Sequence, residues 1–132
     1  MNKTLEGKIA LVTGGSSGIG TAIVKSFAQA GAHVAFTYHS NKTGAESVLS
    51  EIEAMGVKGA YYQADMADFE KAQNVVDQVM EKFDTLDILV NNAGANQDKV
   101  VWKMTESMWD EVIDTDLKGV FNYIRAASPI FR

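Results

Sequence analysis

The sequence lacks cysteine and is poor in proline and histidine, with one proline, Pro129, and only His33 and His39 among its 132 residues. The absence of cysteine excludes disulfides and thiolate metal ligands and fits a reducing compartment. No closely spaced carboxylates accompany the two histidines, so we predict no metal site. Residues 1–6 lack the apolar core of a signal peptide, and no apolar run is long enough to cross a membrane. We therefore expect a cytoplasmic protein with no membrane contact.

Basic residues are also scarce, because 12 Lys and Arg face 17 Asp and Glu and give a net charge of −5. A nucleic-acid-binding surface needs clustered Lys and Arg, so we expect no nucleic-acid partner. A phosphorylated ligand would instead have to be held by local groups. The apolar fraction of 46% and the charged fraction of 22% are ordinary for a globular protein. The length fits one domain over residues 1–132.

Apolar runs alternate with segments of helical periodicity along the whole chain. The runs predict strands at Ile9–Val12, Val34–Tyr38, Gly59–Gln63 and Ile88–Val90. The periodic segments predict helices at about 18–31, 43–55, 68–83 and 105–128. This alternation favours an α/β fold of the Rossmann type, a doubly wound parallel sheet with helices on both faces.

Helix boundaries are indicated by local signals. Segments 43–46 and 107–110 have the capping-box pattern, and Asp68 is placed to cap the third helix. Pro129 falls where the last helix is expected to end.

The segment Thr13–Gly20 directly follows the first predicted strand and opens the first helix. Its glycines at 14, 18 and 20 read G-x-x-x-G-x-G, which differs from the commoner G-x-G-x-x-G, and no lysine follows as in a nucleoside-triphosphate loop. The N–H groups and dipole of a helix start attract an anion, and glycines let a pyrophosphate approach the backbone. We predict a dinucleotide site; the alternative is a tight strand-to-helix connection that binds nothing.

Two further polar signals follow predicted strands. Asp65 comes after the third strand, and Asn91–Gly94 follows the fourth. Both would lie at the carboxyl edge, where parallel sheets place their ligands. Taken alone, Asp65 is also compatible with the start of a helix, and Asn91–Gly94 with an ordinary polar turn.

These motifs and the segment 109–121 occur in an order that resembles the amino-terminal half of a short-chain dehydrogenase/reductase. Segments 5–15 and 116–121 are most similar to the 3-oxoacyl-acyl-carrier-protein and acetoacetyl-CoA reductases. The resemblance implies strand order 3-2-1-4, a domain incomplete at its carboxyl end, and reduction of a 3-oxoacyl thioester. It also implies a homo-oligomer formed through the long last helix or an exposed sheet edge.

The resemblance further implies which residues meet the dinucleotide. Asn91 would help to hold the sheet. The residues implied to contact phosphates, adenine and ribose are Gly14, Ser16, Ser17, Gly18, Ile19, Gly20, Asp65, Met66, Asn92, Ala93 and Gly94.

Charge after the second strand bears on the choice of cofactor. NAD enzymes usually place an acid there for the ribose 2′-hydroxyl, and an acid would repel a 2′-phosphate. Residues 37–42 contain no acid and offer Tyr38, Ser40 and Lys42 instead, which favours NADP(H) over NAD(H). Against this, Ser17 stands where many NADP-preferring relatives carry a basic residue, and the segment is also compatible with a solvated loop.

The family's catalytic serine and Tyr-x-x-x-Lys are expected beyond Arg132, so we expect the chain alone to be inactive. Tyr38-x-x-x-Lys42 matches the pattern by chance, because it lies on the adenosine side. The family's helix asparagine, which kinks the helix and whose main-chain carbonyl holds a water of the proton relay, aligns with Asp116. An aspartate in the apolar stripe of this helix is costly to bury unless it is paired or protonated.

Three functions remain open at this point. The first is the cofactor-binding part of an oxidoreductase of 3-oxoacyl thioesters. The second is a noncatalytic dinucleotide-binding module, and the third is a self-associating structural fragment that needs its missing half. The sequence identifies neither the acyl chain nor its carrier.

Overall fold

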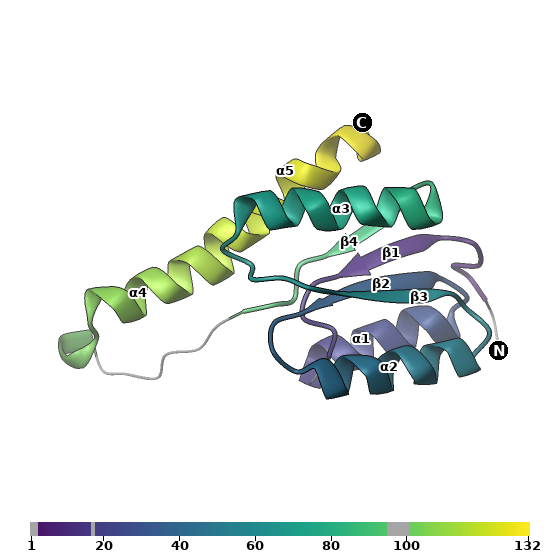
Figure 1. Ribbon diagram of the computed structural model, residues 1–132, viewed down its shortest axis with the longest axis horizontal. Coiled ribbons are helices and arrows are strands. Elements are labelled where there is room, and N and C mark those ends of the chain that lie inside the picture. The colour runs from purple at the N-terminus through teal and green to yellow at the C-terminus, as the bar shows by residue number, and fades with distance from the viewer. Residues whose placement is uncertain (1–2, 17, 95–100) are drawn as a thin grey trace.

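The computed structural model describes residues 3–16, 18–94 and 101–132 and contains a sheet of four parallel strands (Figure 1). The strands are β1 (Ile9–Val12), β2 (His33–Tyr38), β3 (Gly59–Gln63) and β4 (Ile88–Val90), in the order β3-β2-β1-β4. The predicted fold and strand order are confirmed. Only β2 differs, because it begins one residue early, where His33 pairs with Ile9.

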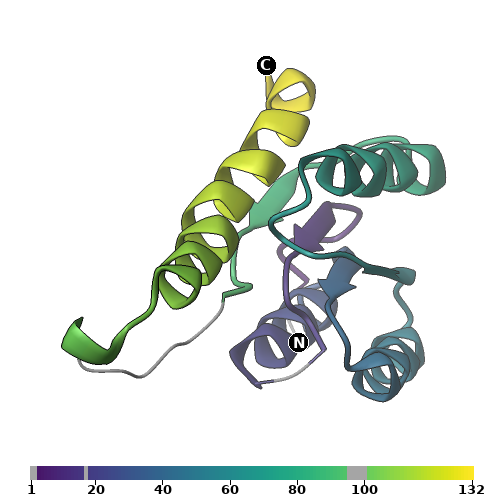
Figure 2. The same cartoon turned by 60° about the vertical axis from the view of Figure 1, so that its left-hand side comes forward.

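Helices cover both faces of the sheet (Figures 1 and 2). Helices α1 (Gly18–Gln29) and α2 (Lys42–Ala54) lie on one face, and α3 (Phe69–Phe83) lies on the other beside the last helix. Successive strand residues point to opposite faces, so Val12 packs in the core under α1 and α2 while Leu11 packs in the core under α3. Both faces are therefore apolar, as buried parallel strands require.

The carboxyl-terminal helical segment is not uniform. It comprises a short 3-10 turn, η1 (Val101–Lys103), then α4 (Glu106–Val112), a π-helical stretch η2 (Ile113–Lys118) and α5 (Gly119–Phe131). The predicted single helix over 105–128 is correct in place but misses the π-helical stretch. Pro129 lies inside α5, and only two more helical residues follow it.

The caps show where local signals compete. Asp68 caps α3 as predicted, because its side chain accepts a hydrogen bond from the N–H of Lys71 at 3.0 Å. The capping boxes at 43–46 and 107–110 are wrong. Asn41 caps α2 through Gly44, and Thr105 caps α4 through Met108. In both cases a residue two positions upstream reaches a first-turn N–H, and the helix starts before the predicted cap.

Among the helices of the described ranges, none is long and apolar enough to cross a membrane.

Tyr123 of α5 is the largest fully buried side chain in the core beneath α3. Its hydroxyl has no hydrogen-bond partner within the described part of the chain. Burial, together with the negative charges of Asp68 and Asp65, raises the pKa of Tyr123 well above its ordinary value of 10.0. The folded protein therefore holds this tyrosine neutral.

We expect Tyr123→Phe to stabilise the protein by about 1 kcal/mol at pH 8, because it removes a buried polar group without a partner. The gain should grow above pH 10, since Tyr123 then ionises in the unfolded chain but stays neutral in the folded one. Urea unfolding at pH 8 and 10.5 measures both effects. Tyr61→Phe, at a half-buried ring, is the matched control, and a loss of stability in Tyr123→Phe would contradict the prediction.

Candidate functional site

A cleft of about 480 Å³ opens at the carboxyl ends of the strands. The loops after β1, β2, β3 and β4 form it, and the α4–η2 segment closes one side. It collects most of the residues predicted from the sequence: Gly14, Ser16, Ile19, Gly20, Tyr38, Ser40, Asp65, Met66, Asn92, Ala93 and Gly94. Gly18 and Lys42 do not line it, and Ser17 lies outside the described residues.

The loop after β1 is built on close backbone contacts. Gly14 has φ +72°, and a Cβ placed on it would lie 3.0 Å from the Cα of Ala93. A Cβ on Gly20 would lie 1.8 Å from the carbonyl oxygen of Gly14. Gly18 differs, since it has φ +58° but open space where a Cβ would be. The first helix can therefore begin directly against the loop only because residue 20 is glycine.

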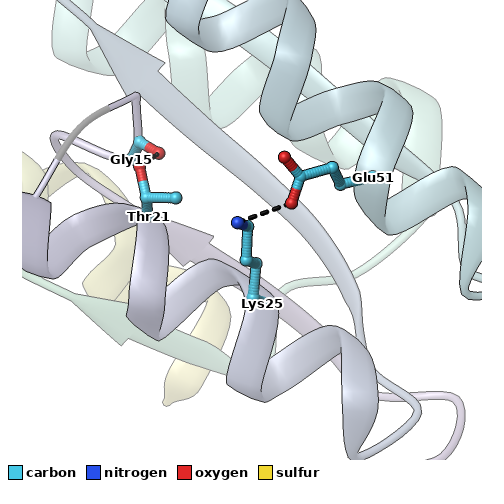
Figure 3. Close-up of polar contacts among 4 residues, drawn as sticks. All are labelled: Gly15, Thr21, Lys25 and Glu51. Carbon is cyan, nitrogen blue, oxygen red and sulfur yellow. Dashed lines mark hydrogen bonds and ion pairs between the residues drawn. The ribbon is translucent and has the colours of Figure 1, made fainter.

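Two threonines hold this loop. The N–H of Gly14 donates a hydrogen bond of 3.1 Å to the hydroxyl oxygen of Thr37 in β2. The N–H of Gly15 donates one of 2.9 Å to the carbonyl oxygen of the same residue. Thr21 of α1 donates its hydroxyl to the carbonyl of Gly15 at 3.0 Å (Figure 3). The amides of Gly14 and Gly15 are thus used internally. The N–H groups left for a ligand are those of the first turn of α1, which a helix cannot satisfy by itself.

Helix α2 begins beside the same loop. The amide of Asn41 donates to the carbonyl of Ser16 at 3.4 Å, while its oxygen caps the helix. Further along, Lys25 of α1 and Glu51 of α2 form an ion pair at 2.5 Å on the surface (Figure 3). An exposed pair of this kind adds little stability. The Asn41 contact is the one that bears on the cleft.

The loop after β4 is tied to β1 by a buried threonine. The hydroxyl of Thr13 accepts hydrogen bonds from the N–H groups of Asn92 and Ala93 at 3.0 and 3.1 Å. The side-chain amide of Asn92 donates to the carbonyl of Gly14 at 3.2 Å. Asn91 keeps a buried side-chain oxygen with no hydrogen-bond partner among the described residues. The segment Asn91–Gly94 therefore joins two loops, which an ordinary polar turn does not do.

The turn after β3 carries Asp65 and Met66. One carboxylate oxygen of Asp65 accepts the N–H of Ala67 at 2.9 Å, so this side chain stabilises the turn before α3. Asp65 also lines the cleft, so the two interpretations of this residue are compatible. The carbonyl of Met66 accepts a buried hydrogen bond from the side chain of Asn122 at 2.9 Å.

The loop after β2 carries no carboxylate between residues 37 and 42. Tyr38 is buried and packs edge-on against Tyr61 with ring centroids 5.6 Å apart. Ser40 is exposed and lines the cleft, whereas Lys42 is the exposed first residue of α2.

Asp116 lies in the π-helical stretch and is exposed, so it avoids the burial cost expected for the apolar stripe. A Cβ on Gly94 would lie 3.0 Å from a carboxylate oxygen of Asp116, which places this side chain beside the loop after β4. Glu111 and Thr115 line the cleft from the same segment. Sequence reasoning missed both, although their spacing of four puts them on one helix face.

Thr13 and Thr37 lie in the segments 13–20 and 37–42 that the sequence analysis singles out, but their roles in holding the loops were not predicted, and Asn122 was missed altogether. Thr13 and Thr37 each stand near the end of a strand beside the glycine loop, and this position is the only signal that the sequence offers. No sequence pattern relates Asn122 to Met66. In the described residues, no group of three or more His, Cys, Asp or Glu side chains could hold a metal ion.

Residues 8–132 match the family described as short chain dehydrogenase. The chain belongs to the short-chain dehydrogenase/reductase family. It is 47% identical over 122 residues to the 3-oxoacyl-[acyl-carrier-protein] reductase FabG of Staphylococcus aureus, covering 92% of this chain and 50% of that protein. It is 40% identical over 125 residues to FabG of Thermotoga maritima, covering 95% and 50%. The chain thus spans about half the length of the curated relatives it matches.

Solved structures are similar to nearly the whole of this chain. A short chain dehydrogenase from Burkholderia cenocepacia in complex with NADP superposes with TM-score 0.94 at 42% identity, covering 96% of this chain and 52% of that one. A blue fluorescent protein from a metagenomic library in complex with NADPH superposes with TM-score 0.91 at 38% identity, covering 96% and 52%.

The glycine loop of this short-chain dehydrogenase/reductase chain offers a matched pair of substitutions. We expect Gly20→Ala to destabilise the fold by about 3 kcal/mol or more, because its Cβ has no room against the carbonyl of Gly14. Gly18→Ala should cost only about 1–2 kcal/mol, the strain of a left-handed residue in open space. Denaturant unfolding of both variants measures the difference. Equal losses would show that Gly20 does not set the approach of α1.

Proposed function

We propose that this chain binds NADP(H) in the cleft and forms the cofactor-binding part of a cytoplasmic reductase that converts a 3-oxoacyl thioester into the 3-hydroxyacyl thioester. The observation that carries the proposal is the close contact of Gly14, Gly20 and Ala93 at the start of α1. It leaves a backbone-lined surface at a helix N-terminus, where a pyrophosphate fits. The similarity to FabG proteins supports the choice of substrate.

The residues present fit a dinucleotide. The first turn of α1 contains no acidic residue, so nothing there opposes the attraction of its N–H groups and dipole for phosphate. Ser16 and Ile19 flank this position on the wall of the cleft. A pyrophosphate at the middle of the cleft leaves one nucleoside toward β2 and β3 and the other toward β4. The cleft volume lies within the usual range for ligand sites.

Each end of the cleft then has a role. Asp65 and Met66 would contact the adenine, and Asn92, Ala93 and Gly94 the ribose of the nicotinamide half. When bound, NADPH supplies a hydride for reduction of the carbonyl. The loop after β2 would take the 2′-phosphate through Tyr38, Ser40 and Lys42, because no carboxylate is present there to repel it. A bound structure of a relative with NADP supports this choice.

We propose only a positioning role for Asp116. Its place beside Gly94 puts it at the nicotinamide end of the proposed site. The π-helical stretch around it is compatible with the backbone function that the family assigns to an asparagine at this position.

A noncatalytic dinucleotide-binding module is the second candidate, and one observation favours it. The single Tyr-x-x-x-Lys of this chain, Tyr38 to Lys42, lies at the adenosine end, and the Tyr38 side chain is buried. It is therefore badly placed to donate a proton to a substrate carbonyl.

We also propose that the chain forms a homo-oligomer. The α4–α5 segment exposes large apolar side chains, among them Trp109, Leu117, Phe121 and Ile124, at 58, 64, 55 and 48% of their surface. In the described sheet, β4 pairs only with β1, so its other edge is open for pairing.

The cofactor proposal predicts distinct effects of two substitutions in a calorimetric titration. Gly18→Val should abolish NADPH binding in a folded protein, because a branched side chain at the first residue of α1 would obstruct the approach of the pyrophosphate to the helix N-terminus. Lys42→Glu should weaken NADPH about five- to tenfold and NADH much less.

The control for Lys42→Glu is Lys58→Glu, which makes the same charge change just before the start of β3, away from the cleft. If Lys42→Glu weakened the binding of NADPH and of NADH equally, this would contradict the proposed contact between Lys42 and the 2′-phosphate. Unchanged NADPH affinity in a folded Gly18→Val protein would contradict the proposed pyrophosphate site at the start of α1.

We predict that the 132-residue chain will not oxidise NADPH in the presence of acetoacetyl-CoA. A positioned proton donor contributes roughly 10²–10⁴-fold to such a reaction, and Tyr38 is not positioned to act as one. A spectrophotometric assay that follows the absorbance of NADPH at about 340 nm tests this. Substrate-dependent oxidation that disappears in Tyr38→Phe would instead assign catalysis to that tyrosine.

A further inference from the structure

We propose that Asn122 of α5 is a positioning residue that sets the adenine-recognising turn after β3. The proposal rests on the dinucleotide binding proposed above. It adds a residue outside the cleft that governs one specific part of that binding, the discrimination of the adenine base.

The contact itself is buried and direct. Asn122 is 1% exposed, and its side-chain amide donates a hydrogen bond of 2.9 Å to the carbonyl of Met66. Met66 is 5% exposed and lines the cleft. A buried carbonyl that loses its donor must find another or turn toward water. The orientation of the peptide after Met66 therefore depends on Asn122.

Helix α5 also touches the turn through its backbone. A Cβ on Gly119 would lie 2.7 Å from the Cβ of Met66 and 3.1 Å from its carbonyl oxygen. Glycine at 119 is thus what lets α5 reach the turn, one helical turn before Asn122. Beyond the turn, the Arg125 guanidinium lies 4.6 Å from the centre of the Phe69 ring, where α3 begins. Helix α5 lies next to α3 and is inclined to it (Figures 1 and 2).

The other end of the turn is fixed independently. The N–H of Ala64 donates to the carbonyl of Tyr38 at 2.9 Å, which joins the turn to β2. Asp65 and Met66, the two residues proposed to contact adenine, lie between this anchor and the Asn122 anchor. Hydrogen bonds to a base edge are directional, so a small displacement of the turn removes them. Loss of the Asn122 bond should thus weaken recognition of the base and leave the phosphate end unchanged.

A merely structural role for Asn122 would lower stability without changing base preference. The readout is therefore the ratio of affinities for NADPH and for its hypoxanthine analogue, in which an oxo group replaces the 6-amino group of adenine. Both ligands share the pyrophosphate, the 2′-phosphate and the nicotinamide half. Any change in the ratio reports on the base alone.

The test compares wild type with Asn122→Leu, which has a similar size but no donor, and with Gly119→Ala, which pushes on Met66 and leaves Asn122 intact. Val79→Ala is the matched control, because Val79 is fully buried in the same core on α3 and does not line the cleft. We expect wild type to bind NADPH about tenfold more tightly than the hypoxanthine analogue. In both test variants this preference should fall to about twofold or less, whereas Val79→Ala should keep the wild-type preference.

Three outcomes would overturn this inference and leave the proposed cofactor binding intact. They are an unchanged ratio of the two affinities in both test variants, an equal loss of base preference in Val79→Ala, and a wild type without preference for adenine. A folded wild type that binds neither ligand would overturn the proposed function and this inference together. Gly119→Ala displaces the same turn from a second position, so the test does not depend on Asn122→Leu alone.

Discussion

The approach of α1 to the loop after β1 is the constraint on which the site depends. It requires glycine at position 20, because any Cβ there would meet the carbonyl of Gly14. That same carbonyl accepts the side chain of Asn92, so the contact also fixes the loop after β4. Thr37 orients the loop from the other side by binding the N–H groups of Gly14 and Gly15. The cleft is thus shaped before any ligand arrives, which lowers the ordering cost of binding.

Sequence reasoning located the sheet well because parallel strands are short, continuous apolar runs, as in the buried strand Ile9–Val12 and the partly buried edge strand Ile88–Val90. It also placed most cleft residues, since the carboxyl ends of these strands meet at one edge. It failed where several local solutions compete: Asn41 and Thr105 cap helices that have a capping-box pattern two residues later. The π-helical stretch has no comparable local signature, because ordinary helical periodicity continues on both sides of it.

Long-range contacts account for the remaining omissions. Thr13 is unremarkable in the sequence, yet its hydroxyl accepts two N–H groups from the loop after β4. Asn122 is one of several polar residues in an apolar helix, and only the packing of α5 against the turn after β3 gives it a partner. Composition and periodicity describe which face is buried. They do not describe which carbonyl in the chain is left without a donor.

The position of β1 between β2 and β4 also has a consequence for the order of assembly. The bond from Gly14 to Thr37 closes a loop of 23 residues, whereas the bond from Asn92 to Thr13 spans 79. Closing the longer loop costs about 1 kcal/mol more in chain entropy. Contacts on the β2 side are therefore favoured early during folding, and those on the β4 side late. The half of the cleft that faces β4 is completed only when residues far apart in the chain have come together.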